Sequence, residues 1–453
     1  MRSESIIFLV PGVRVIEKHE LGLLGSPVFP EAIPDALAAK HLDFERMVSR
    51  LEEIDAHDAL FLLRNVFFIP KLTYLLRTAP CFLLPDVLSK FDNSVHSSIQ
   101  KILNVRLEEN QWEQCSLPVS LGGLGIRKAT DISLPAFISS TLATQEEVNN
   151  LLPQNTSQWS PFLSEAKNQW KEKLQPTVPA FPGGVSQEDW DLPVCEFKFN
   201  RLLESLQSMS EQARLRAVCQ KGASDWLHAM PVTSLGLKLS DAEVRISCGL
   251  RLGSPLCHTH TCSCGERVNP DGRHGLSCRS SAGPHSRHNH INDLIQRAFG
   301  RADISAIVEP PGLSRSDGKR PDGLTIFPYK HGKKLIWDFT CVDTFATTYV
   351  HNTSKKAGKA AEEAEKRKEA KYKELIDDGY IFIPVAIETM GPLGMSGFKL
   401  FQELGKKISN KYGEKNATSY ILQSISIAIQ RGNTLSILGT PNDQRKLDEI
   451  FYL

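Results

Sequence analysis

The most constraining feature of this chain is a pair of aspartates, Asp322 and Asp338, at the ends of two short apolar runs. Residues 324–327 and 334–337 have strand composition, and residues 330–333 between them have turn composition, which predicts a β-hairpin. A hairpin brings the two carboxylates close together although fifteen residues separate them in the chain. Because proteins hold Mg²⁺ through one or two carboxylates together with substrate phosphates, the pair is a candidate magnesium site.

Each aspartate alone has a simpler interpretation as a turn or cap residue, since Asp322-Gly323 is a common turn pair. The pattern gains specificity from a lysine-rich segment at 355–373, which predicts a helix after the hairpin. Two acids and a lysine are the groups needed to hydrolyse a phosphodiester. Most cations of this helix are explained as solvated charges that pair with glutamates four residues away.

Two lysines of this helix, Lys368 and Lys371, are equivalent candidates for the active site. They lie three residues apart and therefore on one helix face, so the sequence does not choose between them. Glu309 and Glu388 each stand near the end of a predicted strand and are candidates to complete a metal-ligand shell.

The ten cysteines are unevenly distributed, because four of them fall within residues 257–278. That distribution indicates a metal site in a reducing compartment rather than a disulfide framework, and hence the nucleus or cytosol rather than secretion. Three thiols and one imidazole form the predicted structural zinc site, a Cys₃His set: Cys262, Cys264, His274 and Cys278. Alternative ligands lie next to them: Cys257, His258 and His260. The simplest alternative is a loop that carries reduced thiols.

The composition gives no global signal for a polyanionic partner, since the formal net charge is +1. Any contact with nucleic acid must therefore depend on a local basic surface. The sequence contains no run of eighteen apolar residues, and its first residues do not have the pattern of a signal peptide, so no membrane partner is expected.

Periodicity predicts an α+β multidomain protein with a mostly helical N-terminal half and a C-terminal three-layer α/β domain. Helical spacing dominates 35–76, 85–103 and 129–143, and Ser240 to Val244 has the form of a capping box. Prolines concentrate in one stretch, which we interpret as a linker. The predicted divisions are a helical region at 1–150, the Pro-rich linker at 151–195, a helical segment at 196–255, the zinc knuckle at 256–285 and, at 286–453, a domain with the order α-β-β-β-α-β.

Three N-terminal sequence segments, at 24–27, 69–77 and 117–126, resemble the region after the palm of a non-LTR retrotransposon reverse transcriptase. In that family the region forms the primer-grip turn, the helical thumb and the connection. The paired-aspartate motif of the palm, Tyr- or Phe-x-Asp-Asp, is absent from this sequence, and its only Asp-Asp pair is Asp377-Asp378. Polymerase activity is therefore not expected of this chain.

The C-terminal part resembles the PD-(D/E)XK nucleases and, more closely, the restriction-enzyme-like endonuclease of site-specific non-LTR retrotransposons. That family has a Cys-Cys-His-Cys knuckle, an Arg-His-Asn segment, Arg/Lys-Pro-Asp, a second acid and a lysine on the next helix. The matching positions are, in order, Cys262 to Cys278, Arg287-His288-Asn289, Arg320-Pro321-Asp322, Asp338 and Lys368-Glu369-Ala370-Lys371-Tyr372. Two features depart from the pattern: Thr340 stands two residues after Asp338 in place of a lysine, and the knuckle spacing is unusual.

The resemblance implies a Mg²⁺-dependent DNA endonuclease that nicks a target site, with a structural Zn²⁺ in the knuckle. Asp322 and Asp338 would hold the metal with the carbonyl of Phe339, and Lys368 or Lys371 would orient the attacking water. Glu309 would complete the shell. The implied partner is DNA, with element RNA as a second candidate, and protein partners stay open.

Two alternatives remain from the sequence. One is a catalytically inactive remnant of a retroelement that binds nucleic acid through its zinc knuckle while the acids have drifted. The other is a junction-resolving nuclease on the same fold, which would cut branched DNA without site preference.

Overall fold

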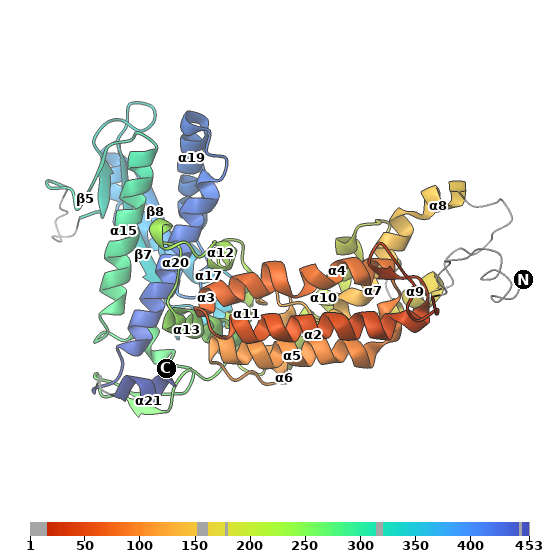
Figure 1. The fold of residues 1–453 in the computed structure, drawn as a ribbon. Helices are drawn as coiled ribbons and strands as arrows, with labels where there is room; N and C mark the ends of the chain where they lie inside the picture. Colours follow the sequence, from red (N-terminus) through yellow and green to blue (C-terminus); the bar gives the residue numbers. More distant parts are fainter. Residues whose placement is uncertain (1–15, 152–161, 177–179, 314–319, 444–445, 453) are drawn as a thin grey trace, which may run out of the picture. The chain divides into compact units, whose positions relative to one another are not determined.

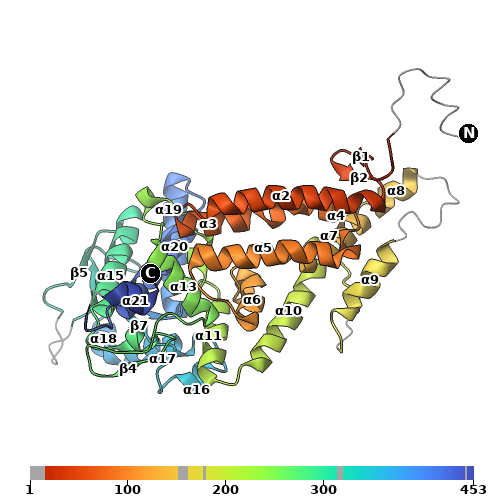
Figure 2. The same cartoon turned by 60° about the horizontal axis from the view of Figure 1, so that its bottom comes forward.

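The computed structural model describes residues 16–151, 162–176, 180–313, 320–443 and 446–452. These residues are mostly helical, with a small mixed sheet in the C-terminal part, so the protein is α+β as predicted (Figures 1 and 2). The chain forms two compact units. We call them the N-terminal unit, Met1–Ile54, Leu62–Ile99 and Ile126–Lys198, and the C-terminal unit, Asp55–Phe61, Gln100–Gly125 and Phe199–Leu453.

The N-terminal unit is built from helices that pack around aromatic side chains. Its elements are β1 (Gly22–Leu23), β2 (Ser26–Pro27), η1 (Pro30–Ala32), α2 (Ile33–Leu51), η2 (Leu63–Phe67), α4 (Ile69–Thr78), η3 (Cys81–Leu83), α5 (Pro85–Leu103), α7 (Ala129–Ala143), α8 (Gln145–Leu151), α9 (Phe162–Glu172) and α10 (Gln187–Ser205). Helices α2 and α5 lie side by side (Figures 1 and 2), where Phe44 is 6.2 Å from Phe91 between ring centroids.

The segment interpreted from its prolines as a linker contains α9 and the first half of α10. Trp170 of α9 and Trp190 of α10 are fully buried, and their ring centroids are 5.1 Å apart. The Trp170 indole N–H donates to the carbonyl of Trp190 at 2.7 Å. Two buried tryptophans dominate the local packing energy, since each removes a large apolar area from water.

The helical stretch Ala56–Thr78 could span a membrane by its length and composition alone, a test that core helices of soluble proteins also pass. The stretch is interrupted before Pro70, because η2 is a π-helical turn and Phe68 has φ −103° and ψ −104°. Pro70 then lies in the first turn of α4, where a missing N–H costs nothing.

The C-terminal unit contains the sheet and the remaining helices. They are α3 (Ala56–Leu62), α6 (Glu109–Ser116), η4 (Val119–Leu121), α11 (Met209–Cys219), α12 (Asp225–His228), η5 (Thr233–Leu235), α13 (Asp241–Leu252), α14 (His274–Ser277), α15 (Gly283–Arg301), α16 (Val350–Thr353), α17 (Lys359–Lys371), α18 (Lys373–Asp377), α19 (Met395–Tyr412), α20 (Ala417–Leu438) and α21 (Leu447–Phe451). Helix α13 begins with the predicted capping box between Ser240 and Glu243. Helices α15 and α20 lie side by side (Figure 1).

The four-stranded sheet has the order β5-β6-β7-β8, from β5 (Ala306–Val308), β6 (Gly323–Thr325), β7 (Leu335–Val342) and β8 (Ile381–Glu388). Strands β5, β6 and β7 pair antiparallel, which confirms the predicted hairpin, and β7 pairs parallel with β8. A parallel pair needs a crossover connection, which α16, α17 and α18 supply.

Helices cover both faces of this sheet, as the alternation along β7 requires. Trp337 and Phe339 belong to a buried cluster with side chains of α15, α19 and α20. On the other face, Ala361 and Ala364 of α17 pack against Ala386 of β8. The small alanines let α17 approach the strands closely.

A second hairpin, β3 (His260–Thr261) and β4 (Arg267–Val268), lies between α13 and α14. Gly265 has φ +92° in its turn, a conformation that favours glycine. The hairpin is joined to the C-terminal segment, because Ser263 N donates to the Thr440 carbonyl at 2.9 Å and His258 N donates to the Ile450 carbonyl at 2.7 Å.

Candidate functional site

The hairpin β3–β4 and helix α14 bring the four predicted zinc ligands together. Cys262 and Cys264 lie in the turn of the hairpin, His274 begins α14 and Cys278 follows it. The Sγ atoms of Cys262 and Cys278 are 3.6 Å apart, and Cys264 Sγ is 3.2 Å from His274 Nε2. All four ligand atoms lie within 4.8 Å of one another, so this Cys₃His cluster could bind a structural zinc ion.

The three alternative ligands have other contacts. The Cys257 thiol is directed at the carbonyl of Asn269, and burial raises its pKa to about 12. His260 Nε2 is 2.9 Å from Thr440 Oγ1, and His258 Nδ1 is 3.0 Å from the Tyr452 hydroxyl. The fold therefore selects one set among the seven candidates.

Two thiols of the cluster differ in acidity: burial and the neighbouring Cys262 and Cys264 raise the pKa of Cys278 to about 11, whereas the pKa of Cys262 is lowered. Burial raises the pKa of Cys262, but hydrogen bonds from the backbone of Cys264 and from the neighbouring thiols and imidazole outweigh it and lower this pKa to about 7. A thiol that ionises near neutral pH is a ready metal ligand, because the thiolate is the binding form.

The strands β6 and β7 place the two predicted acids opposite each other. The register pairs Gly323 with Trp337, so the preceding position, Asp322, stands across from Asp338. Asp322 Oδ2 accepts a hydrogen bond from Phe339 N at 2.6 Å. Asp338 is 3% exposed and accepts bonds from two residues of the segment after β7: Tyr372 at 2.6 Å and Lys368.

The two carboxyls differ in acidity. Burial raises the pKa of Asp322, but the hydrogen bond from His288 and the charge of that imidazole outweigh burial and hold the pKa below its usual range. For Asp338, burial and the negative charge of Asp322 outweigh the effect of Lys368, and its pKa is raised. Neighbouring carboxyls with pKa values pushed apart are typical of catalytic or metal sites.

The structure distinguishes the two lysine candidates. Lys368 forms an ion pair with Asp338, whereas Lys371 Nζ donates to the Tyr372 hydroxyl at 2.8 Å. Lys371 is therefore linked to the acid through the tyrosine hydroxyl.

The two glutamate candidates lie in different surroundings. The Glu309 side chain is exposed and forms an ion pair with Arg320, while its backbone N–H donates to the Asp322 carbonyl at 2.7 Å. Glu388 is fully buried and accepts from the backbone N–H groups of Ala360 and Ala361 at 3.0 and 3.3 Å. Its carboxylate thus caps the N-terminus of α17 instead of joining the aspartates.

Three side chains next to the acids received no role in the sequence interpretation: His288, Asn292 and Tyr372. His288 Nε2 is 3.1 Å from Asp322 Oδ1, and a pocket of about 200 Å³ lies beside this contact. The sequence signals for the pair on α15 are the Arg287-His288-Asn289 segment of the resemblance and the four-residue spacing of His288 and Asn292, which puts them on one helix face.

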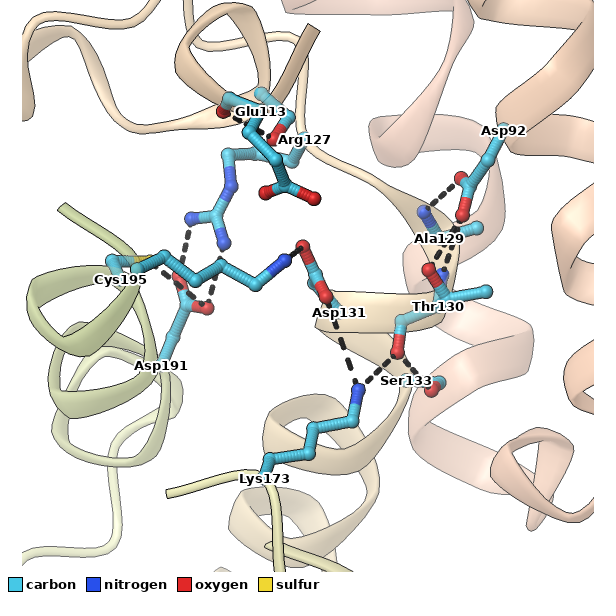
Figure 3. Close-up of polar contacts among 12 residues, drawn as sticks. Asp92, Glu113, Arg127, Ala129, Thr130, Asp131, Ser133, Lys173, Asp191 and Cys195 are labelled. Atoms are coloured by element: carbon cyan, nitrogen blue, oxygen red, sulfur yellow. Dashed lines mark hydrogen bonds and ion pairs between the residues drawn. The ribbon is translucent and has the colours of Figure 1, made fainter. Parts of the chain in front are cut away.

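A separate cluster of buried charges lies in the N-terminal unit (Figure 3). Arg127 forms a two-point ion pair with Asp191 at 2.5 and 2.9 Å, and Lys198 is 2.7 Å from Asp131. Lys173 donates to the Thr130 carbonyl at 2.7 Å. The cluster joins α7 to α10 and to the end of α9, so we interpret it as structural.

No protein-family model matches this chain, and no curated protein matches it either. The family resemblance noted in the sequence therefore remains a prediction that rests on the motifs themselves.

Proposed function

We propose that the C-terminal unit is a Mg²⁺-dependent DNA endonuclease of the PD-(D/E)XK type, with a three-layer α/β core. The observation that carries the proposal is the convergence of Asp322, Asp338 and Lys368 from three separate elements. The mixed sheet with helices on both faces supports the same assignment. In this reading the chain would nick target DNA and would not polymerise.

The donor set suits a hard divalent cation. Asp322 and Asp338 offer carboxylate oxygens, with the Phe339 carbonyl as a further ligand, and Mg²⁺ prefers oxygen. When bound, Mg²⁺ lowers the pKa of a water ligand and neutralises charge on the phosphate. Glu309, next to the pocket, is a candidate for the remaining shell.

Three side chains would assist the metal by orienting the water, the phosphate and the ligand Asp338. The Lys368 ammonium would donate a hydrogen bond to the attacking water or to a phosphate oxygen. Tyr372 would keep Asp338 in place through its hydrogen bond while Lys368 interacts with the water or the phosphate. Lys371 would support the site through the tyrosine hydroxyl.

The zinc cluster would be structural in this protein. All four of its positions are taken by protein ligands, which leaves no position for substrate. DNA is the proposed partner, element RNA is a second candidate, and the nucleus is the proposed location because the substrate is DNA.

Nicking of supercoiled plasmid by the full-length, zinc-loaded protein tests the proposal. We expect nicked circles with Mg²⁺, none without added divalent ion and none with Asp338→Asn. The exposed Asp378 provides a matched control, since Asp378→Asn removes an acid from α18's C-terminal end without touching the site. If the folded wild type binds DNA but does not nick it, the nuclease proposal is wrong and the binding remnant is favoured.

A further inference from the structure

His288, on helix α15, forms a hydrogen bond with one carboxylate oxygen of Asp322. Its Nε2 lies 3.1 Å from Asp322 Oδ1, while the other oxygen accepts from Phe339 N at 2.6 Å. Both carboxylate oxygens therefore accept a hydrogen bond, one from helix α15 and one from strand β7. A carboxylate with both oxygens engaged cannot rotate freely about its terminal bond.

Asn292 supports this contact from one turn further along α15. It is buried, and its amide NH₂ donates a hydrogen bond to Asp322, the carboxylate to which His288 Nε2 also donates, with Asn292 Nδ2 3.1 Å from that ring nitrogen. Its Oδ1 accepts from Trp337 Nε1 at 3.1 Å. An indole N–H can only donate, so it fixes the amide with its carbonyl toward Trp337 and its NH₂ group toward His288 and Asp322.

Trp337 is itself rigid. It is fully buried, and its ring stacks on Phe299 with centroids 5.1 Å apart. The indole also lies against Gly323, where a Cβ would be only 1.9 Å from a ring carbon. The fixed indole ring thus orients the Asn292 amide, which donates to Asp322 beside the His288 imidazole.

We propose that His288 and Asn292 are positioning residues that orient the Asp322 carboxylate for metal binding, with Trp337 fixing the amide. The inference rests on the proposed function, which makes Asp322 a metal ligand. The carboxylate has four lone pairs, so the three hydrogen bonds from His288, Asn292 and Phe339 still leave one for a cation. Groups that orient a ligand in this way typically affect metal affinity or activity about 10- to 100-fold.

Metal titrations of the full-length, zinc-loaded protein test this role. We expect His288→Ala to raise the Mg²⁺ concentration for half-maximal plasmid nicking about tenfold, with Asn292→Ala in the same direction. His288→Gln, whose amide N–H can replace the imidazole donor, should stay within about threefold of the wild type. His290→Ala, at an exposed position of the same helix, should leave the titration unchanged.

Calorimetric titration with Mn²⁺ gives a readout that does not depend on cleavage. His288→Ala should weaken Mn²⁺ binding by a similar factor, while His288→Gln and His290→Ala bind like the wild type. Equal Mn²⁺ affinity and equal Mg²⁺ dependence for His288→Ala and wild type would overturn the inference. Should His288→Ala fail to fold, the comparison between Asn292→Ala and His288→Gln decides in the same way.

The two proposals fail separately. A wild type that binds Mn²⁺ but does not nick DNA contradicts the nuclease and leaves the His288 effect on Mn²⁺ measurable. A wild type that nicks and loses activity with Asp338→Asn, while His288→Ala behaves normally, contradicts only the positioning role.

Discussion

The Tyr372 hydroxyl donates a hydrogen bond to Oδ1 of Asp338 over 2.6 Å. Tyr372 is fully buried, and its ring lies 4.9 Å from that of Phe382. We expect Tyr372→Phe to keep this packing but to lower plasmid nicking about tenfold, because Asp338 loses a group that orients it. The free energy of unfolding should fall by about 2 kcal/mol, measured by urea titration. Tyr412→Phe, at an exposed tyrosine, is the control, and equal activity of the two variants would argue against a role for the hydroxyl.

The two lysines of α17 should differ in their effect on cleavage. Lys368→Ala removes the partner of Asp338 and should reduce single-turnover nicking by about two orders of magnitude. Lys371→Ala removes a hydrogen bond to the Tyr372 hydroxyl, one contact further from Asp338, and should cost a few-fold. Lys366→Ala, an exposed lysine of the same helix paired with Glu362, controls for the loss of a positive charge. A larger loss for Lys371→Ala would reverse the assignment of the two lysines.

The Cys₃His cluster should retain zinc only with its full ligand set. Cys278→Ser is expected to lose the metal, measured by elemental analysis, and to lower the melting temperature, because Cys262 and Cys278 lie in the buried cluster around Leu256 and Val268. Cys257→Ser changes a buried cysteine of the same segment outside the ligand set. It should keep stoichiometric zinc. If Cys257→Ser loses zinc while Cys278→Ser keeps it, Cys257 is a zinc ligand in place of Cys278.

Stability should depend on pH through Glu388, whose pKa burial raises from 4.5 to about 7 against the effect of its hydrogen bonds. Because the folded protein keeps this proton to a higher pH than the unfolded chain, the protonated group stabilises the fold below about pH 4.5, and this contribution is lost as the pH rises through about 7. Glu388→Gln, which mimics the protonated form, should match the wild type at pH 5 and be more stable at pH 8, by at most about 3 kcal/mol. Thermal melts at both pH values check this.

An exposed glutamate of the same region, Glu374, is the control for that experiment. Glu374→Gln should shift the melting temperature equally little at both pH values. If Glu388→Gln shows no difference between pH 5 and pH 8, the carboxyl of Glu388 is not the group that titrates.

The buried charges of the N-terminal unit should be coupled to its stability (Figure 3). Burial raises the pKa of Asp131, but Lys198 and Lys173 outweigh it and lower this pKa, so the acid is ionised beside them. Asp131→Asn removes the buried carboxylate that pairs with both lysines and should destabilise the unit by about 3 kcal/mol in urea titrations. The exposed pair of Asp43 and Arg46 offers a matched control, since Asp43→Asn should cost less than about 0.5 kcal/mol. Similar losses for both variants would contradict the buried role.

Much of the fold is predictable from the sequence because its signals are local. The alternation around 324–337 predicts the β6–β7 hairpin, and the spacing of apolar residues predicts α5 and α7 at Pro85–Leu103 and Ala129–Ala143. The capping box at Ser240 predicts the start of α13. Each of these features is determined by residues within about one or two helical turns or one strand pair, and the observed structure agrees with the local sequence preference.

The contacts within the sites are less predictable, because they join residues from distant segments. The bond between His288 and Asp322 spans 34 positions, and that between Tyr372 and Asp338 also spans 34. No periodicity encodes which lysine of α17 faces Asp338, since that depends on the helix rotation set by its alanines against β8. The choice of zinc ligands likewise depends on Thr440 and Tyr452, which engage the competing histidines.

The attachment of the β3–β4 hairpin to the C-terminal segment has a thermodynamic consequence. Ser263, inside the Cys₃His cluster, donates to Thr440, and His258 donates to Ile450. Whatever orders the hairpin therefore also orders residues that lie more than 170 positions later in the chain. By linkage, zinc binding and docking of the C-terminal segment must strengthen each other by the same factor. Removing α21 should therefore weaken the affinity of the Cys₃His cluster for zinc, although α21 contributes none of the four ligands.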